Sequence, residues 1–101
     1  MSGVNRVKIS GVVLQCGEVR HTPAGIPVVE LQIQHESVQV EAEMQRQVRL
    51  EADAVVIGPL AKMAATLRVD DKVAIGGFLA QKSQKNDRLV VHVSELQRID
   101  C

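Results

Sequence analysis

Positively charged side chains gather in one short polar segment near the C-terminal end of the sequence. Lys82, Lys85 and Arg88 fall within seven residues that contain no apolar side chain. Lysine and arginine neutralise phosphate groups, so three cations on one loop can contact the backbone of a nucleic acid. The simpler interpretation is a surface loop that its charges keep solvated, and the segment by itself does not decide between the two.

Three arginines elsewhere in the chain could extend such a surface. Arg20 stands just before a turn, and Arg46 and Arg49 belong to one alternating segment, with Arg49 on its outward face. A guanidinium group can meet phosphate and can also stack on a base through its planar face. For Arg20, an ordinary surface charge before a turn is an equally good interpretation.

The residue types that support catalysis or bind metal ions form no matching pattern. No serine lies in a Gly-flanked nucleophile elbow, so no catalytic triad can be assembled. The histidines are His21, His35 and His92, and none stands at ligand spacing from a cysteine or a carboxylate. Gly76-Gly77 lacks the lysine that follows in a phosphate loop. We therefore expect no enzyme, no metal site and no cofactor.

Composition leaves the class of partner open. The chain has 101 residues, which suits one domain over residues 1–101, and its 12 Lys and Arg residues balance 12 Asp and Glu residues. A zero net charge neither indicates nor excludes a nucleic acid partner. The sequence holds one Phe and no Tyr or Trp. The core must therefore be aliphatic, and most of the rings on which single-strand binders stack bases are missing, which argues against strong binding by one subunit.

The cysteines and the hydropathy pattern bear on the compartment. Cys16 and Cys101 form no CxxC pair and no metal-ligand spacing, so a reduced pair is expected, with a disulfide as the alternative. No apolar run is long enough to span a membrane, and the first residues have no signal-peptide pattern. We expect a cytoplasmic protein that does not bind membranes.

Alternation of apolar and polar residues, the period of half-buried strands, recurs in five segments. They cover residues 7–16, 29–36, 48–56, 73–80 and 89–99. After the third segment, Gly58-Pro59 opens a run with apolar residues at helical spacing through Leu67, which predicts a helix of about two to three turns. A turn at 22–27 and polar loops at 37–43 and 81–88 separate the strands. The order predicts an all-β protein, a five-stranded OB-fold barrel with one short helix between strands three and four.

Two local expectations depend on this pattern. Gly17 is expected to bend or bulge the chain after the first strand. Phe78, the single aromatic residue, lies between Gly77 and Leu79, and a core position is the more common role for such a ring than a stacking surface.

Several segments resemble known families. Asn5–Gly11 and the turn Thr22–Pro27 are similar to the single-stranded DNA-binding protein superfamily. The segments that resemble the PriB family of primosomal replication proteins are His35–Gln39 with Arg46-Gln47, Gly77-Phe78 ahead of a lysine-bearing loop, and Val91-His92. The resemblance covers essentially the whole chain.

This resemblance implies a homodimer that binds single-stranded DNA and the restart helicase PriA, stimulates the helicase, and hands over to the next primosome component, a DnaT-like protein. It also implies that the segment from Lys82 to Arg88 carries DNA-binding lysines and that Arg20 occupies a basic DNA-contacting position. Two residues depart from the family pattern. Arg49 stands where an aromatic residue is expected, and Glu36 stands where a basic residue is expected. Both predict weaker DNA affinity and greater weight on helicase contacts.

Two other functions remain possible for the same fold. A general single-strand DNA-binding protein is disfavoured because no acidic tail follows the barrel and the aromatic residues for tight coating are missing. An OB module that contacts only protein is consistent with the zero net charge. Binding that weakens as salt rises would favour DNA contact through phosphates, and no DNA binding at any salt would favour the protein-only module.

Overall fold

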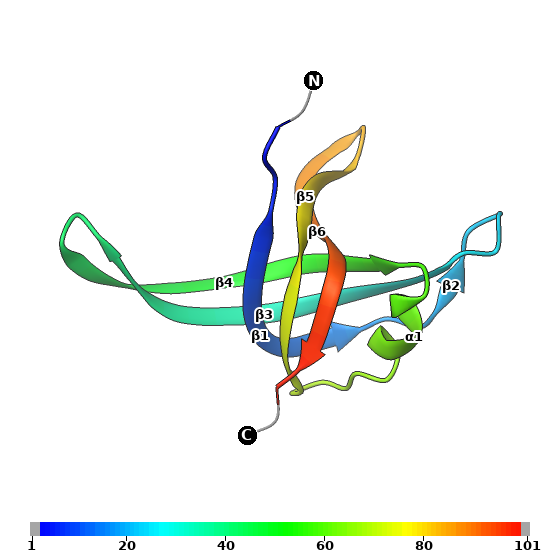
Figure 1. Cartoon of the computed structure of the whole chain (residues 1–101), viewed down its shortest axis with the longest axis horizontal. Helices are drawn as coiled ribbons and strands as arrows, with labels where there is room; N and C mark the ends of the chain where they lie inside the picture. Colours follow the sequence, from blue (N-terminus) through cyan, green and yellow to red (C-terminus); the bar gives the residue numbers. More distant parts are fainter. Residues whose placement is uncertain (1–2, 100–101) are drawn as a thin grey trace.

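A closed barrel of antiparallel strands dominates the computed structural model, which describes residues 3–99 (Figure 1). The strands are β1 (Val7–Cys16), β2 (Arg20–His21), β3 (Pro27–Glu41), β4 (Met44–Ile57), β5 (Lys72–Ser83) and β6 (Asn86–Arg98), and the helix is α1 (Leu60–Ala64). Their order is β1-β5-β6-β4-β3-β2, and an additional β1–β3 pairing closes the barrel. Among the described strands, β4 and β6 form the one parallel pair. Five long strands with a helix between the third and the fourth confirm the predicted OB fold, and the two-residue β2 is an addition to it.

The strand faces follow the sequence pattern. In β3, Val29, Leu31 and Ile33 are at most 4% exposed, whereas Glu30 between them is exposed. The core joins such residues from all five long strands with Ala61, Ala64 and Leu67, and every member is aliphatic. Phe78 is not among them: its side chain is 46% exposed, so the expected core position is wrong. Neighbouring Leu79 faces inward instead, because alternate residues of a strand point to opposite faces.

Two glycines allow the strands to approach closely where the barrel closes. A Cβ atom on Gly11 would meet the carbonyl oxygen of Gln34 in β3, and one on Gly77 would meet the carbonyl oxygen of His92 in β6. A bulge lies in β1 between Val13 and Gln15, earlier than the expected bend at Gly17. Gly11 and the bulge let β1 pair first with β5 and then with β3, whereas Gly77 brings β5 close to β6.

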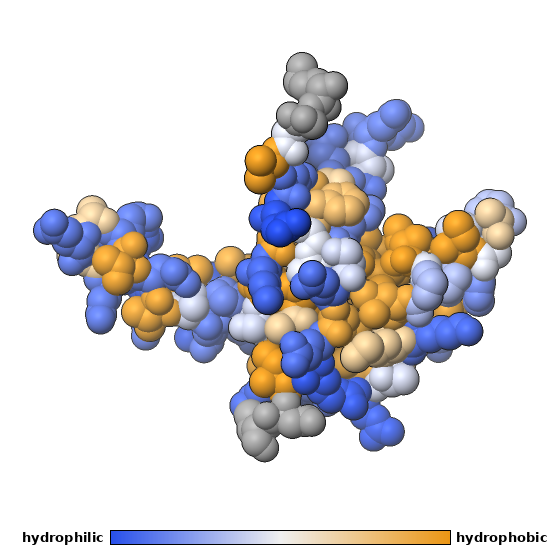
Figure 2. Space-filling model, in the orientation of Figure 1, coloured by the Kyte–Doolittle hydropathy of each residue, from blue (hydrophilic) through white to orange (hydrophobic). Residues whose placement is uncertain are grey.

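The connection predicted at residues 37–43 is a continuation of two strands. β3 and β4 stay in register from Val28↔Ile57 to Glu41↔Met44, and only Ala42 and Glu43 form the turn, both at positive φ as a two-residue hairpin requires. The resulting arm extends well beyond the barrel along the longest dimension of the molecule (Figure 1). It is mostly polar, with exposed apolar side chains between the charges at Val38, Val40 and Met44 (Figure 2).

The polar segment near the C-terminal end is also mostly strand. β5 continues through Ser83 and β6 begins at Asn86, so the loop predicted for residues 81–88 is reduced to the turn at Gln84 and Lys85. Ser83 Oγ accepts a hydrogen bond from the backbone N–H of Asn86 at 3.1 Å and stabilises this turn. The cations of this segment therefore lie on two strand ends and a turn.

The helix is shorter than predicted. α1 holds five residues, and the backbone N–H groups of Thr66 and Leu67 then bond three residues back, to Met63 and Ala64. The apolar side chains of the helix nevertheless face the barrel, since Ala61 and Ala64 are fully buried against it. Over residues 3–99, no helix is long and apolar enough to cross a membrane. Cys101 lies outside the described residues.

Candidate nucleic-acid interface

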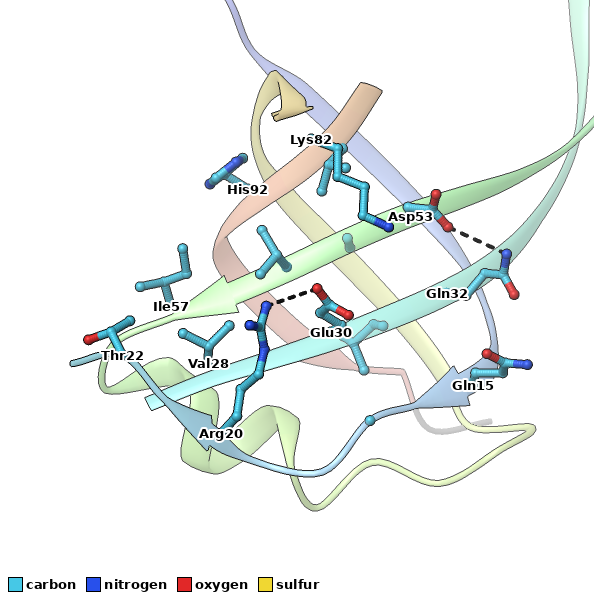
Figure 3. A pocket seen from close by; sticks show the side chains of 15 residues that line it. Gln15, Arg20, Thr22, Val28, Glu30, Gln32, Asp53, Ile57, Lys82 and His92 are labelled. Atoms are coloured by element: carbon cyan, nitrogen blue, oxygen red, sulfur yellow. Dashed lines mark hydrogen bonds and ion pairs between the residues drawn. The ribbon is translucent and has the colours of Figure 1, made fainter. Parts of the chain in front are cut away.

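A groove of about 500 Å³ runs across the outer face of β3 and β4, between β2 on one side and the end of β5 on the other (Figure 3). An apolar part of its floor comes from neighbouring strands. Val28 and Ile57 are cross-strand partners of β3 and β4, and Val55 and Val90 line the groove beside them. Ile57 is 47% exposed, so the groove presents apolar surface to whatever enters it.

One wall of the groove is an ion pair from β2 and β3. Arg20 Nη2 lies 3.0 Å from Glu30 Oε1, and both side chains are more than half exposed (Figure 3). An exposed pair of this kind contributes about 0–1 kcal/mol to stability, so an incoming phosphate can compete with the carboxylate for the guanidinium group.

The opposite wall joins β4 to the β5–β6 hairpin. Arg88 Nε lies 2.9 Å from Asp53 Oδ2, and Gln32 Nε2 donates to Asp53 Oδ1 at 3.4 Å. Lys82 also lines the groove on this side, reaching over β4 from the end of β5 (Figure 3). Arg20 and Lys82 therefore line one groove together with the carboxylates of Glu30 and Asp53, and Arg88 lies next to it through its ion pair with Asp53.

The two arginines of β4 lie on opposite faces of the arm. Arg49 is the register partner of Glu36 on the outer face, which continues from the groove, and its Nε lies 3.0 Å from Glu36 Oε1. Arg46 lies on the other face and pairs with Glu41 at 2.7 Å. The Glu36 carboxylate, noted in the sequence as unfavourable for phosphate, is thus directly matched with Arg49.

The six candidate cations divide into two groups. Arg20, Arg46, Arg49 and Arg88 each pair with a carboxylate. Within residues 3–99, Lys82 and Lys85 have no ion-pair partner, and Lys85 lies at the hairpin turn. Arg20 and Lys82 line the groove, and Arg88 pairs with the groove residue Asp53. Arg49 lies farther along the same face, and Arg46 lies on the opposite face.

A pair of stacked rings lies beside the groove and was not predicted from the sequence. Phe78 and His92 are register partners on β5 and β6, and their ring centroids are 5.0 Å apart with planes 9° from parallel. His92 lines the groove. The available signal was the alternation of β6, in which His92 faces away from buried Val91 and Val93.

The barrel, its strand order and the groove across β3 and β4 define an OB-fold protein of the single-strand-binding type. The sequence model of a family described as another single-strand binding protein family matches residues 5–95. The replication restart protein PriB of Bordetella pertussis is 38% identical over 96 residues, covering 95% of this chain and 90% of that protein.

Solved structures agree with this class. PriB from Ralstonia solanacearum superposes with a TM-score of 0.86 at 29% identity, covering 95% of this chain and 98% of that one. The single-stranded DNA binding protein from Thermus aquaticus shares the fold with a TM-score of 0.79 at 20% identity, covering 99% of this chain and 52% of that one. The chain belongs to the PriB family of replication restart proteins.

Proposed function

We propose that this chain binds single-stranded DNA in the groove across β3 and β4, as an accessory protein of replication restart. The observation that carries the proposal is a partly apolar groove lined by Arg20 and Lys82, with Arg88 held beside it by the groove residue Asp53. Cations can track a phosphate backbone while unpaired bases cover the apolar surface. In this proposal residues 1–101 act as one OB domain without catalytic activity, in the cytoplasm.

Five cations form the proposed DNA path, and Arg46 is a sixth candidate outside it. Lys82 and Lys85 contact phosphates without first breaking an ion pair, and Arg20 and Arg88 contribute by exchanging a carboxylate for a phosphate. Arg49 extends the path along the outer face of the arm. Arg46 lies on the opposite face, and it joins the path only if the strand wraps around the arm.

The helicase PriA and a DnaT-like protein are the proposed protein partners. Family membership supports this, because relatives are named replication restart proteins. The paired arginines support it as well, since DNA binding that first has to break ion pairs is weak and leaves more of the task to protein contacts. The expected result is that the chain increases the rate of DNA unwinding by PriA.

A homodimer is the proposed assembly. β1 pairs with β5 over Val7–Val12 but with β3 only from Val12 onward, so among the described strands the second edge of residues 7–11 is unpaired. An unpaired strand edge is a template for pairing with another chain. Light scattering in solution should give twice the mass of one chain.

One observation favours a second candidate, an OB module that contacts only protein. Each arginine that DNA would need already forms an ion pair with a carboxylate, which belongs to Glu30, Glu36, Glu41 or Asp53. This module would bind PriA with no single-stranded DNA present.

Fluorescence anisotropy separates the two candidates. A labelled oligothymidylate and a labelled duplex are titrated with the full chain at low and moderate salt. The proposal predicts binding of the single strand that weakens with salt, and weaker binding of the duplex, whose bases are not free to contact the apolar floor. Absence of single-strand binding at low salt, together with binding of PriA, would support the protein-only module instead.

A further inference from the structure

Phe78 and His92 form an exposed pair of rings on the outer surface of the barrel. The two residues face each other across β5 and β6, and their rings are nearly parallel. Phe78 is 46% exposed although it is the single aromatic residue of the chain. A phenyl ring that only stabilised the sheet would not need to be exposed. It could pack on the inward face of the strand, as the neighbouring Leu79 does.

The strand registers connect this pair to the floor of the groove. Glu30 is opposite Val55, Val55 is opposite His92, and His92 is opposite Phe78, so these four outward side chains form one row across β3, β4, β6 and β5. His92 lines the groove, and it lies on the same side as Lys82 (Figure 3). The stacked rings therefore extend the apolar surface of Val55 in the direction away from the wall formed by Glu30 and Arg20.

The backbone around the rings is held on both sides. Asn5 accepts a hydrogen bond from the Leu79 backbone N–H at 2.9 Å and donates to its carbonyl oxygen at 2.7 Å. At Gly77 the two strands approach so closely that a Cβ atom would meet the carbonyl oxygen of His92. Phe78 is thus fixed between two constrained neighbours, and its ring orientation is fixed by stacking on His92. A ring that is already oriented loses little freedom when a base stacks on it.

We propose that the Phe78–His92 pair is a base-stacking platform at the end of the groove. This inference rests on the proposed binding of single-stranded DNA and adds a contact to the bases rather than to the phosphates. It supplies the aromatic surface that is missing at Arg49, on β4. Base stacking on a ring tolerates any sequence, because every base has a π-face.

The test separates stacking from phosphate contact by removing the bases. Wild type, Phe78→Leu and the control Met63→Ala are titrated with oligothymidylate and with an abasic strand of equal length. Met63 is a suitable control because it is similarly exposed, at 42%, but lies on α1. The expected result is an affinity loss of about tenfold for Phe78→Leu on oligothymidylate, no loss on the abasic strand, and no loss for Met63→Ala on either.

A second variant gives a direct optical readout. Because the chain holds no Trp or Tyr, Phe78→Trp introduces the single strong fluorophore. Its emission should be quenched by oligothymidylate and should be unchanged by the abasic strand. This variant keeps the inference testable if Phe78→Leu does not fold.

Three results would overturn the inference. The first is equal affinity of wild type and Phe78→Leu for oligothymidylate, and the second is an equal loss on both strands. The third is a change in molecular mass of Phe78→Leu by light scattering, which would assign the rings to contact between protein copies. If the wild type binds neither strand, the proposed function fails, and the stacking platform fails with it.

Discussion

Arg88 Nε lies 2.9 Å from Asp53 Oδ2, and the carboxylate is the less exposed partner, at 22% against 61% for the arginine side chain. The groove therefore contains a mostly covered negative charge that is paired with a neighbouring cation. The same arrangement recurs at Arg20 with Glu30 and at Arg49 with Glu36, where both partners are more than half exposed. On the outer face of β3 and β4, the carboxylates thus limit how much charge is available to a phosphate backbone.

Changing Asp53 to Asn should strengthen single-strand binding by a few-fold. The amide keeps an oxygen that can accept the hydrogen bond from Gln32 but no longer neutralises Arg88. The slope of log K against log salt should become steeper by about 0.7, the value for one additional phosphate contact on a single strand. Anisotropy titrations over a salt series measure both. Glu41→Gln is the matched control, because its partner Arg46 lies on the opposite face of the arm; an equal effect of the two changes would contradict a site in the groove.

Glu36→Gln should also increase affinity, through Arg49. The two side chains are register partners 3.0 Å apart, so removal of the carboxylate charge leaves the guanidinium free for phosphate or for stacking on a base. A double variant, Glu36→Gln with Arg49→Ala, should lose the gain. If the gain persists in the double variant, it comes from reduced general repulsion of DNA and not from Arg49.

Core packing predicts a large stability difference between two residues of β3. Ile33 is fully buried and Val38 is 59% exposed on the arm. Ile33→Ala should lower the free energy of unfolding by about 2–5 kcal/mol, since it leaves a cavity in the core. Val38→Ala should change it by less than about 0.5 kcal/mol. Urea denaturation measures both, and similar values for the two would contradict the assignment of the arm as a solvent-exposed hairpin.

Cys16 predicts a dependence of stability on alkaline pH. Burial raises the pKa of the Cys16 thiol, which donates to the Ala64 carbonyl oxygen at 3.4 Å. Because the folded pKa lies above the unfolded one, the contribution of the thiol is complete below the unfolded pKa of about 8.5 and is lost as pH rises toward the folded pKa. In a Cys101→Ser background, the free energy of unfolding should therefore fall between neutral and alkaline pH. The same measurement on the Cys16→Ala variant should not show this fall. The partly buried thiol should also react more slowly with thiol reagents in the native than in the denatured protein; equal rates would contradict its partial burial.

Much of the barrel could be predicted because its strands follow simple alternation. Val29, Leu31 and Ile33 lie on the buried face, as their spacing predicted, and the helix lies between the third and fourth long strands. The arm was predicted as a loop because its side chains are mostly polar and because its turn is Ala42-Glu43, which lacks the asparagine or glycine that usually marks a two-residue hairpin. Its cross-strand ion pairs depend on register, which local sequence does not reveal.

The candidate site could be predicted only as a set of cations. That Lys82 and Arg88 lie near Asp53 follows from the parallel pairing of β4 with β6, a contact between segments far apart in the sequence. Phe78 was assigned to the core because most phenyl rings are buried. Its exposure follows from the register of β5 against β6, which places Phe78 opposite His92. Residue spacing along the sequence does not predict that register.

The most direct test of DNA binding in the groove is the salt dependence of oligothymidylate binding by wild type and by a Lys82→Ala/Lys85→Ala/Arg88→Ala variant, with Lys62→Ala on α1 as the control. The triple variant should bind more weakly, and its salt slope should be shallower by about 2, from about 0.7 for each lost phosphate contact. Lys62→Ala should match the wild type. Unchanged affinity and slope in the triple variant would contradict the account, because DNA would then bind elsewhere on the protein.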